Sequence, residues 1–106
     1  MTGKKAYSSD LNQMMQAVLK ITQERDWAQY HTPKNMAADL VREGSEVLEH
    51  FIWPTNKEIL ADSSRLQEIA DQIGDVLHAL LLLADACNID LAKISKSKTK
   101  ISSRLS

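Results

Sequence analysis

The chain of 106 residues carries 13 basic and 14 acidic side chains, which gives a formal net charge of -1. Its hydrophobic fraction of 43% and charged fraction of 25% are typical of a globular domain, so the composition excludes a collagenous or largely disordered chain. Three glycines and two prolines provide little material for the tight turns of an all-β fold. The composition therefore favours a single all-α domain.

Membrane and secretion signals are lacking in the sequence. The longest apolar run, Ala79 to Ala84, is far shorter than the roughly 20 residues that cross a bilayer, and the first ten residues contain no apolar signal core. The one cysteine, Cys87, has no internal partner for a disulfide, which suits a reducing compartment. We therefore expect a cytoplasmic protein with no membrane partner.

Apolar residues at spacings of three and four predict the first two helices. The first begins at Ser8 or Ser9 and runs to about Gln29. It ends before Pro33, because the residue that precedes a proline is disfavoured in a helical conformation. The second is capped by Asn35 and ends before Pro54. Its predicted apolar side consists of Met36, Leu40, Val41, Val47, Leu48 and Phe51.

Two further helices follow a polar connection over residues 54–63, which contains a short helical turn at 58–61. The third begins at residue 63 or 64 and ends near Asn88, and Asp90 caps the fourth. Residues 76–84 are almost all apolar, and a helix that is apolar on every side must be covered on every side. We expect one domain over residues 1–106, with flexible ends at 1–8 and 103–106, that packs against a second subunit.

Acidic side chains are concentrated in the middle of the chain, where residues 39–90 contain eleven acidic and three basic groups. Like charges spaced by three on a helix repel one another by a few tenths of a kcal/mol unless a cation compensates. If the second and third helices face each other, their oxygen atoms surround a cavity of the kind that Mg²⁺ or Mn²⁺ prefers. A solvated acidic helix face is the competing interpretation. The residues are Glu43, Glu46 and Glu49 on the second helix, and Glu68, Asp71, Gln72 and Asp75 on the third.

Aromatic and basic residues flank this acidic region. Trp27 and Trp53 lie near the ends of the first two helices, and an indole can stack on a base, although both can equally be core anchors. His31 and Lys34 lie at the start of the second helix, where a cation and free backbone N–H groups suit phosphate; an ordinary helix cap is the alternative.

Three segments together resemble the MazG-like all-α nucleoside triphosphate pyrophosphohydrolases, most closely their dCTP pyrophosphatase branch. They are RDWAQYHTPKN at 25–35, LVREGSEVLEHFIW at 40–53 and IGDVLHALLLLA at 73–84, and the similarity extends over about residues 11–100. The resemblance implies a four-helix MazG-like bundle that assembles as a homodimer or homotetramer. It implies Mg²⁺-dependent hydrolysis of deoxynucleoside or nucleoside triphosphates, dCTP or related dNTPs first, to the monophosphate and pyrophosphate. No nucleic-acid polymer is expected as a partner.

The resemblance also assigns residues. Metal binding falls to Glu43, Glu46, Gln72 and Asp75, with Mg²⁺ as the cofactor and Mn²⁺ as an alternative, and the three carboxylates form the catalytic set. Gln72 departs from the family, which has Glu at this position, and an amide oxygen brings no charge. In an alternative register, the family motif is placed three residues earlier and uses Glu68 and Asp71. That placement loses the match at Gly-Asp-Val-Leu, residues 74–77.

The same resemblance implies that Trp27, His31 and Trp53 line the nucleotide pocket, with Lys34 near phosphate and Lys96 closing over the triphosphate. Three other functions remain open from the residues. A catalytically weak nucleotide-binding regulator would use the same groups. A di-iron bundle would use Asp75, His78 and the nearby Glu46 and His50, and a structural dimerisation bundle would use only the apolar surfaces.

Overall fold

The computed structural model describes residues 11–105, and all of its regular structure there is helical, as the composition predicts. The predicted flexible end at 1–8 lies outside the described residues, as does residue 106, whereas residues 103–105 continue the last helix. The elements are α1 (Leu11–Glu24), the 3-10 turn η1 (Ala28–Tyr30), α2 (Pro33–Glu49), α3 (Asn56–Ala61), α4 (Ser63–Ala86) and α5 (Leu91–Leu105). None of these described helices combines the length and apolar character needed to cross a membrane.

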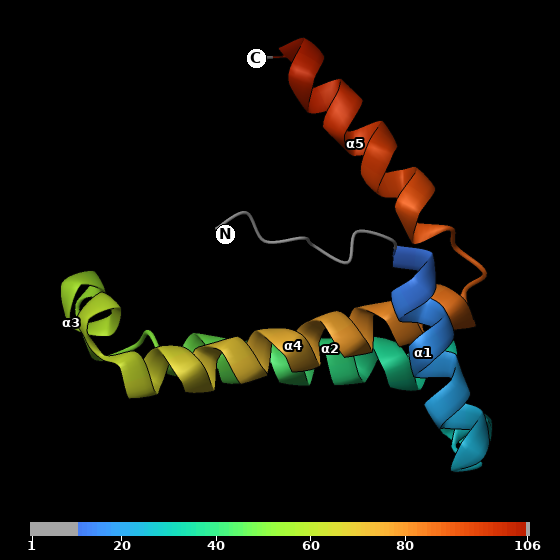
Figure 1. The fold of residues 1–106 in the computed structure, drawn as a ribbon, viewed down its shortest axis with the longest axis horizontal. Helices are drawn as coiled ribbons and strands as arrows, with labels where there is room; N and C mark the ends of the chain where they lie inside the picture. Colours follow the sequence, from blue (N-terminus) through green and yellow to red (C-terminus); the bar gives the residue numbers. More distant parts are fainter. Residues whose placement is uncertain (1–10, 106) are drawn as a thin grey trace, which may run out of the picture.

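Helices α2 and α4 run antiparallel, side by side, and form the main packing unit (Figure 1). Helix α1 crosses one end of this pair, α3 lies at the other end, and α5 projects away from the pair. The radius of gyration is 16.4 Å, against about 13 Å for a compact domain of this length. The four long helices of the predicted bundle are thus present, with a short fifth, in an open arrangement.

Helix α1 ends at Glu24 instead of near Gln29, so the prediction for its end is wrong. Asp26 takes a left-handed backbone conformation, with φ of 56°. The backbone N–H of Trp27 donates to the Thr22 carbonyl at 3.0 Å, and that of Asp26 donates to the Gln23 carbonyl at 3.2 Å. This pair of bonds is a Schellman motif, which satisfies the last carbonyls of the helix and turns the chain out of it.

Helix α2 is capped by Thr32 and not by Asn35, which corrects the second predicted boundary. The Thr32 hydroxyl accepts from the backbone N–H of Asn35 at 3.2 Å, and Pro33 occupies the first helical position. Proline fits there because the first N–H of a helix has no partner inside it. The helix ends at Glu49, several residues before Pro54.

The remaining boundaries agree with the predicted ones to within a few residues. The predicted turn at 58–61 is α3. Thr55 and Glu58 cap its first turn with a reciprocal capping box. Asp62 caps α4 by accepting from the Arg65 backbone, and the Asp90 carboxylate accepts from the Lys93 backbone at the start of α5.

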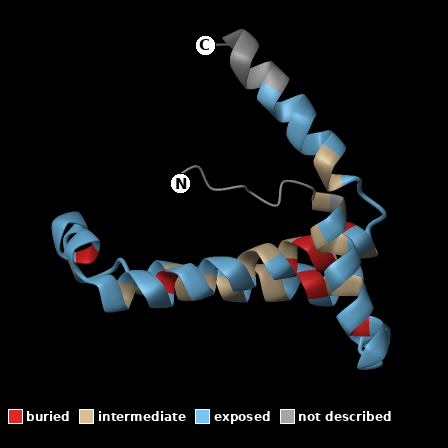
Figure 2. Cartoon of the chain, viewed as in Figure 1, coloured by how far each residue is buried: buried red, intermediate tan, exposed pale blue. Residues whose placement is uncertain are grey.

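The buried core lies mainly where α1 and α2 meet the second half of α4 (Figure 2). Complete burial of one leucine or methionine side chain stabilises a fold by about 1.5–3 kcal/mol, so this crossing is the anchor of the chain. The core residues here are Met36, Ala79, Leu81, Leu82 and Ala84, with Thr22 as the buried polar residue.

Part of the predicted apolar side of α2 is exposed in the single chain. Met36 is buried, but Val41 and Leu48 are 73% and 62% exposed. These two residues are seven positions apart, so they lie on one face of the helix, turned away from α4.

Candidate active site

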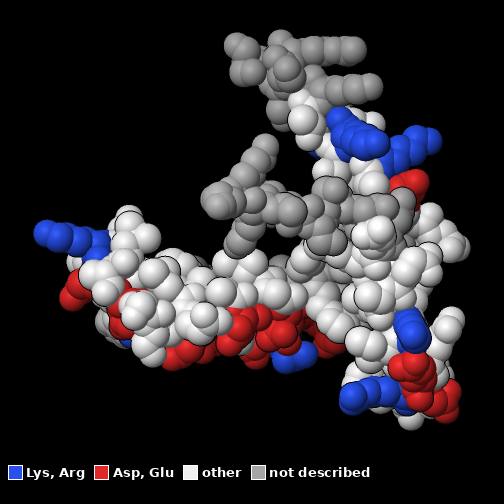
Figure 3. Space-filling view, viewed as in Figure 1, with Lys and Arg blue, Asp and Glu red and all other residues white. Residues whose placement is uncertain are grey.

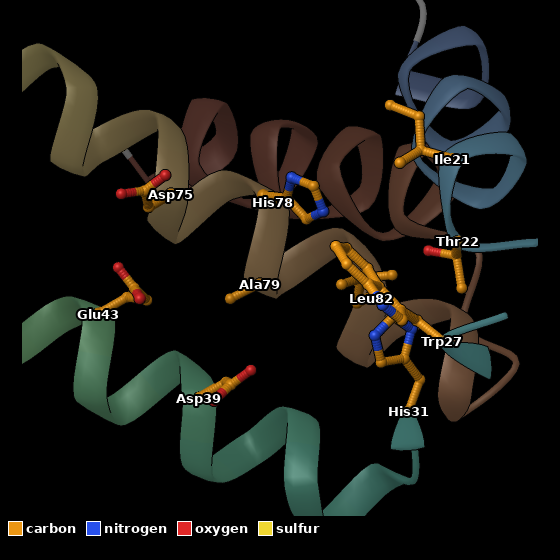
Figure 4. A pocket seen from close by; sticks show the side chains of 10 residues that line it. All are labelled: Ile21, Thr22, Trp27, His31, Asp39, Glu43, Asp75, His78, Ala79 and Leu82. Carbon is orange, nitrogen blue, oxygen red and sulfur yellow. The ribbon is translucent and has the colours of Figure 1, made fainter. Parts of the chain in front are cut away.

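A hollow of about 390 Å³ opens between α2, α4 and the segment that follows α1 (Figure 4). It joins an aromatic end, where Trp27 and His31 lie, to an acidic end formed by both long helices. The lining side chains are Ile21, Thr22, Trp27, His31, Asp39, Glu43, Asp75, His78, Ala79 and Leu82.

The turn after α1 sets the position of the aromatic end. Trp27 is the first residue after the left-handed Asp26, and its ring remains 45% exposed. The guanidinium of Arg25 lies 5.3 Å from the centre of this ring, a cation–π contact. The Asn35 amide donates to the Tyr30 carbonyl at 3.0 Å, which fastens the η1 turn to the start of α2 and so holds His31 beside Trp27.

The acidic end brings one carboxylate from each long helix to the same hollow. Glu43 extends from α2 toward Asp75 on α4 (Figure 4). The Glu43 side chain is only 13% exposed, and its Oε2 atom is buried with no hydrogen-bond partner among the described residues. A buried carboxylate oxygen without a donor is costly, so this atom is available for a cation or a water.

The other two predicted ligands line a separate hollow of about 480 Å³, which shares no lining residue with the first. The surface between α2 and α4 that contains both hollows is called the groove. Glu46 lies there on α2, opposite Gln72 on α4, because the helices are antiparallel and a step of three residues on each keeps the pairs opposed. The Gln72 Oε1 atom is also buried without a partner among the described residues. The four predicted ligands therefore lie along one groove, in two neighbouring hollows.

The donor set of the groove fits a hard divalent cation, because every predicted ligand offers oxygen and two of these oxygens lack partners. Within residues 11–105, however, no three His, Cys, Asp or Glu side chains lie close enough together to hold a metal as they stand. Metal binding would require the carboxylates to turn toward a common point. Their present orientation has a visible cause in Arg42.

Arg42 holds three carboxylates of α2 at once. Its guanidinium lies 3.3 Å from Asp39 Oδ1, 3.1 Å from Glu43 Oε1 and 3.6 Å from Glu46 Oε1. The hydrogen bond that Arg42 donates to Asp39, followed by the negative charge of Glu43, raises the pKa of Arg42 above its ordinary value. Arg42 and Asp39 were not among the predicted site residues, although their spacing of three, with Glu46 four residues beyond Arg42, is the spacing of helical ion pairs.

The family resemblance assigns three further described residues to nucleotide binding. None of the three is among the residues that line the two hollows. Trp53 is 90% exposed beyond the end of α2 that lies farther from Trp27. Lys34 is exposed in the first turn of α2, and Lys96 is on α5, which projects away from the groove.

The residues of the alternative register, Glu68 and Asp71, are exposed, and among the described residues neither contributes to the two hollows. Asp71 instead accepts a hydrogen bond from the Gln67 amide at 3.2 Å.

The charges divide along the molecule. Acidic side chains gather along the α2–α4 pair, whereas basic side chains lie on α5 and near the ends of α1 and α3 (Figure 3). An acidic groove attracts cations and disfavours a bare anion, so a polyphosphate needs a divalent ion or nearby basic groups in order to bind there.

Comparisons with known proteins give a consistent relationship. No protein-family model matches the chain. It is 40% identical over 81 residues to dCTP pyrophosphatase 1 of Rattus norvegicus and 38% identical over 84 residues to that of Homo sapiens, alignments that cover 72% and 76% of this chain. They cover 48% and 49% of the relatives, so the chain spans about half the length of these curated relatives.

A solved structure extends the comparison over the whole fold. The crystal structure of a pyrophosphatase from Archaeoglobus fulgidus superimposes with a TM-score of 0.77 and 30% sequence identity, covering 95% of this chain and 96% of that one. Agreement over nearly all of both chains, together with the motifs at 25–35, 40–53 and 73–84, excludes a chance similarity of helices. The chain belongs to the MazG-like all-α nucleoside triphosphate pyrophosphohydrolase family.

Proposed function

We propose that the protein hydrolyses a deoxynucleoside triphosphate, dCTP or a related dNTP, to the monophosphate and pyrophosphate with the help of Mg²⁺. The observation that carries this proposal is a single groove in which Trp27 and His31 adjoin oxygen donors from two antiparallel helices. A nucleotide has the same two parts, a flat base and a chain of phosphates that binds divalent ions. The names of the relatives support dCTP as the first substrate to test.

The aromatic end would receive the base. The Trp27 ring is partly exposed at the hollow, and a base can stack on its free face because every nucleobase presents a π-surface. His31 lies beside this ring and can donate or accept a hydrogen bond at the edge of the base.

The acidic end would hold the metal and the phosphates. Glu43, Glu46 and Asp75, with the Gln72 amide oxygen, are the groups that would hold Mg²⁺, which when bound neutralises phosphate charge and acidifies a water molecule. We assign Glu46 the removal of a proton from the attacking water, because a carboxylate in this position can act as a general base.

We also propose that the protein works as a homodimer or homotetramer in the cytoplasm. Val41 and Leu48 form an exposed apolar strip on α2, and such a strip gains stability when a second subunit covers it. Trp53 would then contribute to a pocket from a neighbouring chain, and Lys96 would reach the triphosphate through a change in the direction of α5.

Pyrophosphate release over a panel of dNTPs and NTPs, with and without Mg²⁺, tests the function. We expect release that requires Mg²⁺ and is fastest with a dNTP. We expect Glu43→Gln to lower the rate by about a hundredfold or more, because loss of a metal ligand costs more than loss of a group that only orients a ligand. Glu68→Gln is the matched control, since it removes one carboxylate from the exposed side of α4 and should leave the rate within about twofold. Nucleotide binding without pyrophosphate release would instead assign the weak regulatory function, and an equal loss in both variants would contradict the residue assignment.

A further inference from the structure

We infer that Arg42 is an internal counter-cation of the metal site: its guanidinium holds Glu43 and Glu46 and must release them before a divalent ion can bind, so Arg42 sets the metal affinity. This inference rests on the proposed function, because it takes the two glutamates as metal ligands. It concerns a residue that is not itself one of the proposed ligands: Arg42 precedes Glu43 in the pair of glutamates spaced by three, Glu43 and Glu46.

The distances place one guanidinium between both glutamates. Nη2 lies 3.1 Å from Glu43 Oε1, and Nη1 lies 3.6 Å from Glu46 Oε1. The planar guanidinium has donors that point in several directions, so it can serve two carboxylates of one helix at once, as a divalent ion would.

The two oxygens of Glu43 have different environments. Oε1 faces Arg42, whereas Oε2 is buried without a partner among the described residues. Gln72 Oε1, on α4, is buried and unpartnered in the same way. The groove thus contains oxygens that lack a cation, while the guanidinium of Arg42 is engaged with neighbouring oxygens on the α2 side.

Release of the two glutamates need not leave Arg42 without a partner. Asp39 Oδ1 lies 3.3 Å from Nη2, and the Arg42 side chain is 59% exposed, so the guanidinium can remain on Asp39 while the glutamates turn into the groove. The exposed guanidinium is hydrated, which weakens its ion pairs, although the Glu43 partner is only 13% exposed. Arg42 therefore binds the two glutamates reversibly, and it keeps Asp39 as an ion-pair partner when it releases them.

Titration of Mn²⁺ into the full chain by calorimetry, without nucleotide, measures the metal affinity directly. We expect the dissociation constant of Arg42→Gln to fall about tenfold, because two ion pairs that exist in the metal-free protein no longer have to be broken when the metal binds, and two such pairs together change an equilibrium by about this much. Arg42→Lys keeps the charge but replaces the planar fork by a single point donor, so its dissociation constant should fall by about threefold. A value for Arg42→Lys equal to that of the unsubstituted protein would attribute the effect to net charge alone and overturn the release of the glutamates.

Arg65→Gln is the matched control. Arg65 lines the second hollow, but it pairs with Asp62 at 3.7 Å and donates to the His50 carbonyl at 3.4 Å, without an ion pair to Glu46 among the described contacts. Its substitution removes the same charge from the same groove and should change the dissociation constant by less than about twofold. A tenfold fall in this control would also overturn the role of Arg42.

Thermal unfolding gives a second readout. In the presence of EDTA, Arg42→Gln should unfold at a lower temperature than the unsubstituted protein, because the acidic residues of α2 lose their compensating charge. The rise in unfolding temperature caused by saturating Mn²⁺ should be larger in the variant. An equal rise in both proteins would contradict the inference.

Glu43→Gln separates the two proposals. If Glu43→Gln loses Mn²⁺ binding and Arg42→Gln leaves it unchanged, the counter-cation role is wrong and the metal site stands. If Glu43→Gln binds Mn²⁺ as the unsubstituted protein does, the metal assignment falls, and the role of Arg42 falls with it.

Discussion

At the residue scale, Gln72 is the feature that most affects the chemistry of the groove. It offers one buried, unpartnered oxygen at the position opposite Glu46. A carboxylate there would contribute a full negative charge, whereas the amide contributes only a dipole. The metal site proposed here therefore has one charge less than the pattern of the family.

Gln72→Glu should raise the affinity for Mg²⁺ by about tenfold, because ligand charge sets cation affinity, and it should raise Mg²⁺-dependent pyrophosphate release. The measurement is the rate as a function of Mg²⁺ concentration, with circular dichroism to establish that the variant is folded. A folded variant with an unchanged or lower rate would argue against Gln72 as a ligand.

Residue patterns gave only part of this site in advance. The Glu-x-x-Glu and Gly-Asp-Val-Leu motifs directed attention to side chains that the fold does place along one groove. Arg42 lies outside these motifs, although its spacing of three from Asp39 and of four from Glu46 is a sequence signal for helical ion pairs. Trp53 was grouped with Trp27 because both are tryptophans near helix ends and because of the family resemblance, but α2 lies between them and places them at its opposite ends.

At the element scale, short-range hydrogen bonds decide where the helices begin and end. Apolar spacing predicted α4 well because the helix is long and its first half carries an apolar stripe at helical spacing, with a cap at Asp62. It failed at the end of α1, because Asp26 is not a glycine and the sequence gives little warning of its left-handed conformation. It also placed the start of α2 at Asn35, because Thr32 and Pro33 were read as a break and not as a cap followed by a first helical residue.

The cap of α3 makes a prediction about pH. The Glu58 carboxylate accepts from the Thr55 backbone N–H at 2.8 Å, and this bond, with that to the Thr55 side chain, lowers the pKa of Glu58. A carboxyl whose pKa is lower in the folded state stabilises the fold above its unfolded pKa and loses that contribution as the pH falls through the folded value. Glu58→Gln should therefore unfold at a lower temperature than the unsubstituted protein at neutral pH and at nearly the same temperature in acid.

Unfolding temperatures measured across this pH range test the cap, with Glu68→Gln as the control for the removal of one negative charge. Glu68 lies within α4 and is exposed, so its substitution should not reproduce the effect at neutral pH. A constant difference between Glu58→Gln and the unsubstituted protein at every pH would show that the charge of Glu58 does not stabilise the cap.

At the scale of the whole molecule, the chain leaves a large part of its apolar surface uncovered. Trp53, Val41 and Leu60 are each more than two-thirds exposed, and Leu48 is only slightly less so. Sequence periodicity predicted that this surface would be apolar, but it could not distinguish a surface that faces another helix of the same chain from one that faces a second subunit. In the structure, α4 packs on the opposite face of α2, and no other helix of residues 11–105 buries Val41 or Leu48.

Leu48→Glu should shift the protein toward the monomer, because a charge would then be buried without a partner in the assembly. We expect the dissociation constant of the oligomer to rise by about a hundredfold, measured by light scattering across a dilution series. Gln67→Glu adds the same charge to an exposed position of α4 and should leave the assembly intact. An unaltered oligomer in Leu48→Glu would exclude this strip from the interface.

The contact between Arg25 and the Trp27 ring has a consequence for selectivity. Because the Arg25 guanidinium already covers one side of the indole, the proposed nucleobase would stack on the other side alone. Stacking of this kind accepts purines and pyrimidines alike. In the proposed function, discrimination between bases would therefore come from groups around the perimeter of the ring, where Asp39 and His31 are polar neighbours.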